Sequence, residues 1–368
     1  MHLAEITPSI FAGLGLADSD DILGLGQSPH GRECLFLIDG LGERALIDYA
    51  EYAPVLSGLT SKGPVSTAFP STTVTSLTTL MTGALPGAHG MLGYTVRVPR
   101  SDGRILNSLK WDERVDPYTW QPIPTFFERA KNAGITVSHV AAKRYEGSGF
   151  TSAAFRGAEY RGANILEEMA AQASLSLKKS PSFVYVYVNE VDVAGHSDGV
   201  GSDKWLGALS YVDQVLATLI ERLPRGTRIW VTADHGMVNA DEKVVLGREN
   251  SLLEGISLVA GEPRARHLYL DDDHLLGQGP DDAVWRFREF FGGRVDAYTR
   301  NEAIEAEIFG KEVSEASHDR MGDLIVVPGG GIVLIDPLRV DVESAMVGHH
   351  GAMTDMERLV PFRTVEIS

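Results

Sequence analysis

The chain has 368 residues, 43% of them hydrophobic, so it can bury one large core or a core with a smaller lobe. Its net charge of −17, from 33 basic and 50 acidic residues, argues against a basic face for nucleic-acid polymers. The single cysteine, Cys34, excludes internal disulfides, and no apolar run reaches the roughly 18 residues of a membrane span. Because the N-terminal stretch also lacks a basic start and carries acidic residues early, we expect a cytoplasmic protein that enters no membrane.

Apolar runs separated by amphipathic segments set the fold class. Buried strands are predicted at residues 33–40, 135–142, 182–192, 228–236 and 323–330. Helices are predicted at residues 43–60, 74–82, 124–133, 163–174 and 203–223. This alternation predicts an α/β fold that is doubly wound, with a mostly parallel sheet and helices on both faces.

The pattern of apolar residues in 251–322 differs from that of the preceding segments and predicts a small α+β insertion. Strand-like runs at 266–270 and 294–300 alternate there with helix-like runs at 282–291 and 301–310. We expect residues 1–250 to form a catalytic core and residues 323–368 to return to it, with 323–330 rejoining the main sheet. The insertion could serve as a lid or as an oligomer contact, and the sequence leaves that choice and the oligomeric state open.

Polar side chains gather where the predicted strands end, which is where α/β sheets form their sites. Asp and His are the residue types that bind Zn²⁺ or related metals, with an open position left for a substrate. Six such ligands make two sites, and two metals roughly 4 Å apart can clamp both oxygens of a phosphoryl transfer. The candidates are Asp39, Asp192, His196, Asp234, His235 and one of the pair His349 and His350.

A threonine-rich segment, "FPSTTVTSLTTLMTG" at residues 69–83, is the candidate source of a nucleophile. Val74, Leu77 and Met81 form one apolar stripe of a short helix that ends at Gly83. Either Thr72 or Thr73 therefore lies at the helix start, where free N–H groups favour an alkoxide or a phosphate. Coordination to a metal would make a threonine hydroxyl competent as a nucleophile.

These motifs in this order resemble the alkaline phosphatase superfamily, and most closely its type I phosphodiesterase/nucleotide pyrophosphatase family. The resemblance rests on "LFLIDGLG", "FPSTTVTSLTTLMTG" followed by "PGAHG", "NEVDVAGH", "TADHGM" and "HHG". It extends from Asp39 to His350, which is most of the chain.

The resemblance implies a role for each matching residue. Thr73 would be the nucleophile and would bind one metal together with Asp39, Asp234 and His235. Asp192, His196 and His350 would hold the other metal; His350 is chosen over His349 because the family's ligand directly precedes glycine. Ser76 stands where the family's nucleotide pyrophosphatases usually have an asparagine that contacts a phosphoryl oxygen, so Ser76 is the candidate substrate contact.

The expected function is hydrolysis of phosphodiester or pyrophosphate bonds in a small nucleotide-type substrate, through a phosphothreonine intermediate, with two Zn²⁺ ions or with Mn²⁺ or another divalent metal. A phosphomonoesterase or a phosphonate C–P hydrolase on the same site is one alternative. A non-catalytic protein that binds a metal or ligand on the same fold is the other. The physiological substrate, its leaving group and the native metal are not specified by the sequence.

Overall fold

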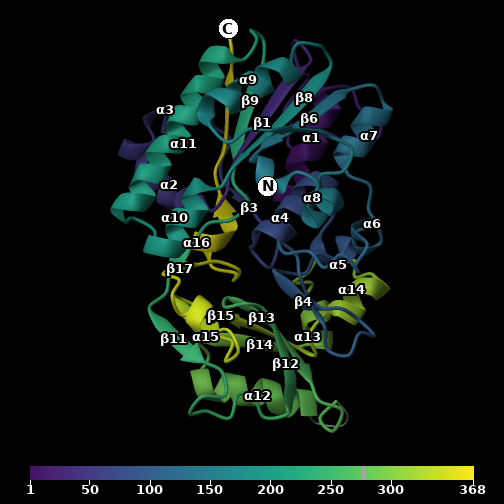
Figure 1. Cartoon of the computed structure of the whole chain (residues 1–368), viewed down its shortest axis with the longest axis vertical. Coiled ribbons are helices and arrows are strands. Elements are labelled where there is room, and N and C mark those ends of the chain that lie inside the picture. The colour runs from purple at the N-terminus through teal and green to yellow at the C-terminus, as the bar shows by residue number, and fades with distance from the viewer. Residues whose placement is uncertain (276–278) are drawn as a thin grey trace.

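The larger part of the molecule is built around one sheet. The computed structural model describes residues 1–275 and 279–368. In spatial order the strands of this sheet are β2 (Thr60–Ser61), β19 (Phe362–Glu366), β9 (Arg228–Thr232), β1 (Arg32–Ile38), β8 (Ser182–Val188), β6 (Thr136–Ala141) and β7 (Glu159–Gly162). The strands from β9 to β7 run parallel, whereas at one edge β19 runs antiparallel to both of its neighbours, β9 and β2. The mostly parallel α/β fold predicted from the sequence is confirmed (Figure 1).

Helices pack on both sides of this sheet, as the burial along β1 and β8 requires. One group contains α9 (Leu166–Ser176), α10 (Glu190–Asp198) and α11 (Asp203–Arg222). Both α9 and α10 contact α11. The other group contains α1 (Ile6–Gly13), α4 (Thr73–Thr82) and α7 (Phe126–Asn132), which also contact one another. Figure 1 shows the strands between these two groups. The short helices of this part are α5 (Pro86–His89), α6 (Pro117–Trp120), α8 (Gly149–Ala154) and α16 (Asp355–Arg358).

The helix predicted at residues 43–60 is interrupted. The segment forms α2 (Glu43–Asp48), a single 3-10 turn at Ala50–Tyr52 and α3 (Pro54–Ser57). Pro54 accounts for the break, because a proline disfavours helical backbone in the residue before it. Ala53 accordingly has φ −136° and ψ 60°, outside the helical region.

A second, smaller lobe carries its own sheet and its own hydrophobic core. Its strands lie in the order β12 (Ile256–Glu262), β13 (Ala265–Leu270), β15 (Leu324–Pro328) and β14 (Val295–Thr299), all antiparallel to their neighbours. The helix α12 (Gly279–Phe291) contacts β14 and β15, and the helices α13 (Arg300–Glu305) and α14 (Glu315–Arg320) follow. The strands and helices predicted within 251–322 are therefore present, and residues 276–278 of that range lie outside the described residues.

The prediction that residues 323–330 rejoin the main sheet is wrong. These residues form β15, which pairs with β13 and β14 in the smaller lobe. A run of Leu, Ile and Val buried on both faces looks the same in either sheet, so its pattern could not identify its partners. The chain re-enters the main sheet only at β19.

Four short two-stranded pairings lie outside the two larger sheets in the described residues. They are β4 (Thr95–Arg97) with β5 (Ile105–Asn107), β10 (Val238–Asn239) with β17 (Gly348–His349), β11 (Glu242–Val245) with β16 (Ile332–Ile335), and β3 (Val65–Ser66) with β18 (Leu359–Val360). The helix α15 (Val340–Glu343) follows β16. Among the described residues, no helix has both the length and the apolar character needed to cross a membrane.

Candidate metal centre

The three predicted aspartate ligands lie where three neighbouring strands end. Asp39 follows β1, Asp192 lies in the first turn of α10 after β8, and Asp234 follows β9. Since β9, β1 and β8 are parallel neighbours, their carboxyl ends meet at one edge of the sheet. Gly40 permits the close approach: it has φ +78°, and a Cβ there would lie 2.9 Å from Cα of Asp192.

The histidines reach the same place from three different segments. His196 lies one turn after Asp192 on α10, and His235 directly follows Asp234. His350 follows β17, which pairs with β10 outside the main sheet. All the predicted ligands therefore converge on one site, although His350 does not come from the main sheet.

One cluster consists of Asp39, Asp234, His235 and the hydroxyl of Thr73. Nε2 of His235 lies 3.3 Å from Oδ1 of Asp39 and 3.6 Å from Oδ2 of Asp234. The same nitrogen lies 3.2 Å from Oγ1 of Thr73. These four side chains are the set that the family resemblance implies for one metal.

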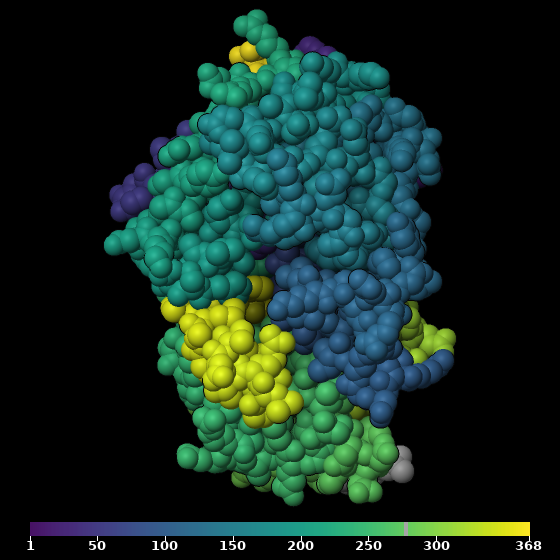
Figure 2. Space-filling model, viewed as in Figure 1, coloured from purple at the N-terminus to yellow at the C-terminus, as the bar shows by residue number. Residues whose placement is uncertain are grey.

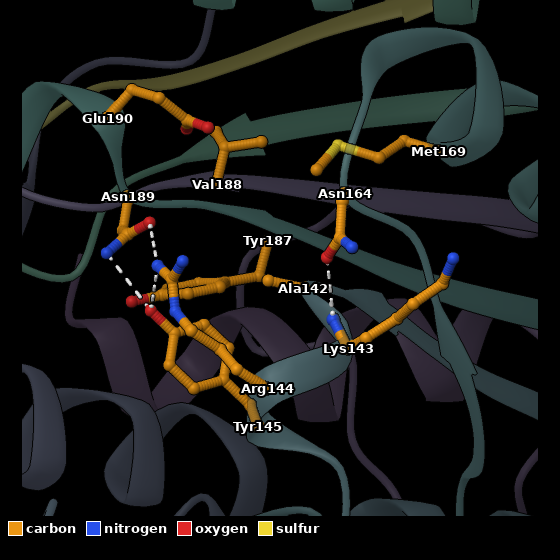
Figure 3. A pocket seen from close by; sticks show the side chains of 10 residues that line it. All are labelled: Ala142, Lys143, Arg144, Tyr145, Asn164, Met169, Tyr187, Val188, Asn189 and Glu190. Atoms are coloured by element: carbon orange, nitrogen blue, oxygen red, sulfur yellow. Dashed lines mark hydrogen bonds between the residues drawn. The ribbon is translucent and has the colours of Figure 1, made fainter.

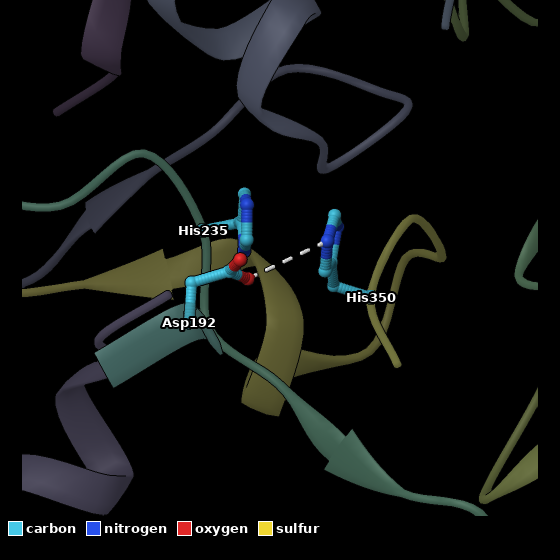
Figure 4. A group of neighbouring side chains, drawn as sticks. All are labelled: Asp192, His235 and His350. Atoms are coloured by element: carbon cyan, nitrogen blue, oxygen red, sulfur yellow. Dashed lines mark ion pairs between the residues drawn. The ribbon is translucent and has the colours of Figure 1, made fainter. Parts of the chain in front are cut away.

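The second cluster consists of Asp192, His196 and His350. Oδ1 of Asp192 lies 3.3 Å from Nε2 of His196 and 3.8 Å from Nε2 of His350. The two Nε2 atoms are 3.2 Å apart. The rings of His350 and His235 are stacked with centroids 3.7 Å apart, and Figure 4 shows them face to face, so the two clusters adjoin. Asp192 and His350 can also form a ligand group with His235.

Each of the three imidazoles directs its Nε2 toward the centre and its Nδ1 toward a backbone carbonyl. Nδ1–H of His196 donates to the carbonyl of Gly348 at 2.8 Å, and Nδ1–H of His350 donates to the carbonyl of Ser71 at 3.0 Å. Nδ1–H of His235 lies 3.1 Å from the carbonyl of its neighbour, Gly236. A carbonyl can only accept, so Nδ1 of each ring carries a proton, and Nε2 has a free lone pair whenever the ring is neutral. When His196 and His350 are both neutral, their Nε2 atoms, 3.2 Å apart, repel each other unless a cation lies between them.

The carboxylates likewise leave oxygens free. Tyr187 donates its hydroxyl to Oδ2 of Asp39, and the backbone N–H groups of Gly40 and His235 donate to Oδ1 of Asp234. The other oxygens, Oδ1 of Asp39, Oδ2 of Asp234 and Oδ1 of Asp192, are buried without a hydrogen-bond donor among the described residues. An anionic oxygen buried without a hydrogen-bond donor is costly, so a cation bound beside these three atoms would stabilise them.

The pKa values of the cluster reflect the same concentration of charge. Burial, and then the negative charge of Asp39, raise the pKa of Asp234 well above its ordinary value. Burial would lower the pKa of His235, but Asp234, Asp39 and Asp192 outweigh it and raise that pKa to about 10. Burial also raises the pKa of Asp192. Carboxylates this close together are stable as anions only when positive charge is added.

The spacing of the donor atoms matches a tetrahedral metal site. Zn²⁺ binds imidazole nitrogen and carboxylate oxygen at about 2.0–2.2 Å, which places neighbouring ligand atoms about 3.3–3.6 Å apart. The separations at His235, between 3.2 and 3.6 Å, and those at Asp192, 3.3 and 3.8 Å, agree with that geometry. Both clusters therefore fit a divalent metal that favours nitrogen and oxygen ligands.

Thr73 is the first residue of α4, and Thr72 is its N-cap. The Thr72 side chain accepts no capping hydrogen bond, whereas the Thr73 hydroxyl contacts His235. The contact distinguishes two threonines that the local sequence could not. Ser76, the predicted substrate contact, is fully buried with an unpartnered hydroxyl, and it does not line the cavities next to Thr73.

Two cavities of about 280 and 290 Å³ meet at Thr73 and Asp192. The first, which we call the lobe cavity, opens toward the smaller lobe. Its lining includes Tyr94, His196, Glu262, Arg339, His349 and His350. The second, which we call the aromatic cavity, opens toward α8. Its lining includes Asp39, His139, Tyr145, Phe150, Phe155 and Tyr187. Figure 2 shows a hollow where the teal, blue and yellow segments around this centre meet.

A third cavity of about 320 Å³ lies beside the aromatic cavity and shares Arg144, Tyr145, Tyr187 and Asn189 with it. Figure 3 shows Arg144, Tyr145 and Asn189 joined by hydrogen bonds. Arg144 donates to the Tyr145 hydroxyl at 2.7 Å, and Asn189 donates to the same oxygen at 3.1 Å. The third cavity therefore adjoins the aromatic cavity, and these polar side chains lie between the two.

Sequence reasoning missed several residues that shape the site. Tyr187 binds Asp39, Glu262 lines the lobe cavity, and Phe150 and Phe155 line the aromatic cavity. The sequence indicated a role for Tyr187 only weakly, through the fact that a phenol near the end of a buried strand needs a hydrogen-bond partner. It gave no signal for Glu262, because the position of Glu262 depends on how the smaller lobe lies against the core.

The sequence matches the family model of type I phosphodiesterase/nucleotide pyrophosphatase over residues 34–353, and the chain belongs to this family of the alkaline phosphatase superfamily. Curated relatives include ectonucleotide pyrophosphatase/phosphodiesterase family member 1 of Homo sapiens, 27% identical over 65% of this chain, and that of Mus musculus, 26% identical over 63%. The chain spans only 28% and 27% of the lengths of these two proteins.

Solved structures show the same fold. Human ectonucleotide pyrophosphatase/phosphodiesterase 5 superposes with a TM-score of 0.70 at 16% identity, covering 90% of this chain and 87% of that one. An inactive murine form of the same protein, with a threonine replaced by alanine and in complex with AMP, superposes with a TM-score of 0.64 at 14% identity, with the same coverage.

Proposed function

We propose that this chain hydrolyses phosphodiester or pyrophosphate bonds in small nucleotide-type substrates, with two divalent cations and Thr73 as the nucleophile. The observation that carries the proposal is the position of the Thr73 hydroxyl, 3.2 Å from Nε2 of His235 at the junction of two clusters of unpartnered ligand atoms. Membership of the type I phosphodiesterase/nucleotide pyrophosphatase family supports the reaction class.

Asp39, Asp234, His235 and the Thr73 hydroxyl would hold one cation, and Asp192, His196 and His350 the other. When bound, divalent cations at these two places supply positive charge that lowers the pKa of a hydroxyl and offsets negative charge on a phosphoryl group. Zn²⁺ suits the nitrogen and carboxylate donors, and Mn²⁺ is the second candidate.

The residues of the chain account for the remaining steps. The Thr73 oxygen attacks phosphorus in line, the bond to the leaving oxygen breaks, and a phosphothreonine remains. Water then cleaves the phosphothreonine and restores the hydroxyl. We place a phosphoryl oxygen at the N–H groups at the start of α4. Ser76 is the proposed side-chain contact, and its hydroxyl would have to be reached from Thr73, because Ser76 is buried outside the lining of the two cavities.

A nucleotide is proposed as part of the substrate for two reasons. The aromatic cavity next to Thr73 offers Phe150, Phe155 and Tyr145 to a planar base. The murine protein of the same fold binds AMP in a form made inactive by loss of a threonine.

A comparison of three substrates on one preparation tests the reaction class: a chromogenic nucleotide diester, the matching monoester and phosphonoacetate, each with Zn²⁺ and with Mn²⁺. The diester is expected to be hydrolysed fastest, because the described residues provide no additional arginine at the two clusters for a dianionic monoester. A clear preference for the monoester or the phosphonate would overturn the proposal. Less than one equivalent of metal after growth in zinc, with no hydrolysis, would favour a non-catalytic protein.

A further inference from the structure

The lobe cavity contains a buried carboxylate that the proposed chemistry does not use. Glu262 ends β12, is 5% exposed and lines this cavity together with Thr73 and Asp192. Its Oε2 accepts the backbone N–H of Tyr94 at 2.8 Å, whereas its Oε1 is buried without a hydrogen-bond donor among the described residues.

Glu262 forms no ion pair with another described residue, and Arg266 and His235 favour its charge only from a longer distance. The neighbouring arginines are engaged elsewhere: Arg264 binds both oxygens of Glu357, and Arg266 binds Glu343. Arg339 lines the same cavity, but its Nε pairs with Glu343 at 3.3 Å. An unsatisfied carboxylate oxygen buried beside a cavity is costly in the free protein and is stabilised once a hydrogen-bond donor in that cavity reaches it.

The lobe cavity is placed to receive the leaving group. Thr73 contacts the cluster of Asp39, Asp234 and His235, so in-line attack directs the departing oxygen to the opposite side. All three members of the other cluster, Asp192, His196 and His350, line the lobe cavity, whereas Asp39 lines the aromatic cavity. The part of the substrate that stays attached to the phosphoryl group then occupies the aromatic cavity. The leaving group extends through the lobe cavity toward Glu262.

We propose that the lobe cavity is a leaving-group subsite in which Oε1 of Glu262 selects substrates whose leaving group carries a hydroxyl donor, as a polyol or a sugar does. A hydroxyl fits better than an ammonium group, because the guanidinium of Arg339 already places positive charge in the same cavity. This inference rests on the proposed diesterase function and names a specificity residue for it.

The test uses three 5′-esters of AMP with a common retained half: the glyceryl ester, the propyl ester, which has the same carbon chain without the free hydroxyls, and the 3-aminopropyl ester. For the unmodified protein with Zn²⁺, kcat/KM is expected to be at least about tenfold higher for the glyceryl than for the propyl ester. In Glu262→Gln the ratio is expected to fall toward one. The amide oxygen of Gln retains the contact with the Tyr94 N–H, so an NH₂ group replaces the unpartnered acceptor, Oε1.

Two further variants make the result specific. Glu242→Gln removes a solvent-facing carboxylate of the same part of the chain and is expected to retain the unmodified ratio. Glu262→Asp keeps the negative charge but moves the carboxylate back by one methylene, so it is expected to lower the ratio of kcat/KM between the glyceryl and propyl esters. This variant replaces Glu262→Gln in the test if Glu262→Gln does not fold. Equal rates for the two esters in the unmodified protein, an unchanged ratio in the folded Glu262 variants, or the highest kcat/KM for the aminopropyl ester would overturn the inference alone. Failure to hydrolyse any ester would overturn both the inference and the proposed function.

Discussion

Adjacent threonines at the start of α4 differ in what their hydroxyls contact. Thr73 contacts His235, whereas Thr72 has β-type backbone and its side chain makes no capping hydrogen bond. The local sequence could not separate them, because either residue can occupy a helix start, and the choice of Thr73 came from the spacing of the family's motif. The contact could not be foreseen from residues 69–83 alone, since His235 is more than 150 positions away.

Replacement of the proposed nucleophile gives the first prediction. Thr73→Ala removes the attacking oxygen but only one of four donors at its cluster, so turnover of a nucleotide diester should fall at least about 1,000-fold while bound metal is retained. Steady-state kinetics together with elemental analysis of the same sample measure both quantities. Thr72→Ala is the matched control, with an expected loss of no more than about tenfold. Near-normal turnover in Thr73→Ala would contradict the proposed mechanism.

The hydroxyl of Tyr187 gives the second prediction. It donates to Oδ2 of Asp39 and so leaves Oδ1 directed at the cluster. Tyr187→Phe should therefore weaken metal binding about 10- to 100-fold, as seen when groups that orient metal ligands are removed. Competition with a zinc-binding dye measures this affinity.

Tyr185→Phe provides the control for that measurement. Tyr185 lies on the same strand, two residues earlier, and its hydroxyl has no hydrogen-bond partner within the described residues. Loss of this hydroxyl should leave metal affinity unchanged. Equal affinities in the Tyr187 variant and the unmodified protein would show that Asp39 is oriented without the phenol.

At the scale of elements, the sequence predicted the strands of the core better than their partners. The runs leading to Asp39, Asp192 and Asp234 were recognisable because each ends in a carboxylate, and they form adjacent strands. The run at 323–330 has the same composition but belongs to the smaller lobe. Periodicity reports burial on one or both faces, whereas pairing depends on contacts distant in sequence, so a pattern alone cannot place such a strand.

The third prediction concerns the junction of the two lobes. Arg264, in the turn between β12 and β13, binds both oxygens of Glu357 on α16 at 3.0 and 2.7 Å, and both side chains are fully buried. Arg264→Met leaves the carboxylate of Glu357 buried without its cation, which should lower the free energy of unfolding by about 3–5 kcal/mol. Urea denaturation monitored by circular dichroism measures the loss.

An exposed ion pair in the smaller lobe serves as the comparison for that variant. Arg294 pairs with Glu242 at the surface, so Arg294→Met should cost no more than about 1 kcal/mol. Similar losses in the two variants would mean that the Arg264–Glu357 pair contributes no more than a surface pair.

For the whole molecule, the two clusters join elements that are distant in sequence, so metal binding should stabilise the fold as well as the reaction. Asp39, Asp192 and Asp234 come from three strand ends, and His350 comes from the segment between the smaller lobe and β19. Their free oxygens and bare nitrogens repel one another without a cation, and a ligand at 1,000 times its Kd stabilises the native state by about 4 kcal/mol per site. Chelation should therefore lower Tm by several degrees, and Zn²⁺ should restore it.

Differential scanning calorimetry before and after treatment with a chelator tests this expectation, and Asp192→Ala supplies the internal comparison. That variant lacks the carboxylate of one cluster and keeps Asp39, Asp234 and His235, so its Tm should fall by a smaller amount on chelation than that of the unmodified protein. Equal chelator shifts would mean that only the first cluster binds metal tightly enough to stabilise the fold. A Tm that does not respond to chelator in either protein, in samples shown to have lost their metal, would mean that the converging side chains are held by packing alone. The cost of three unpartnered carboxylate oxygens would then have to be offset within the protein itself.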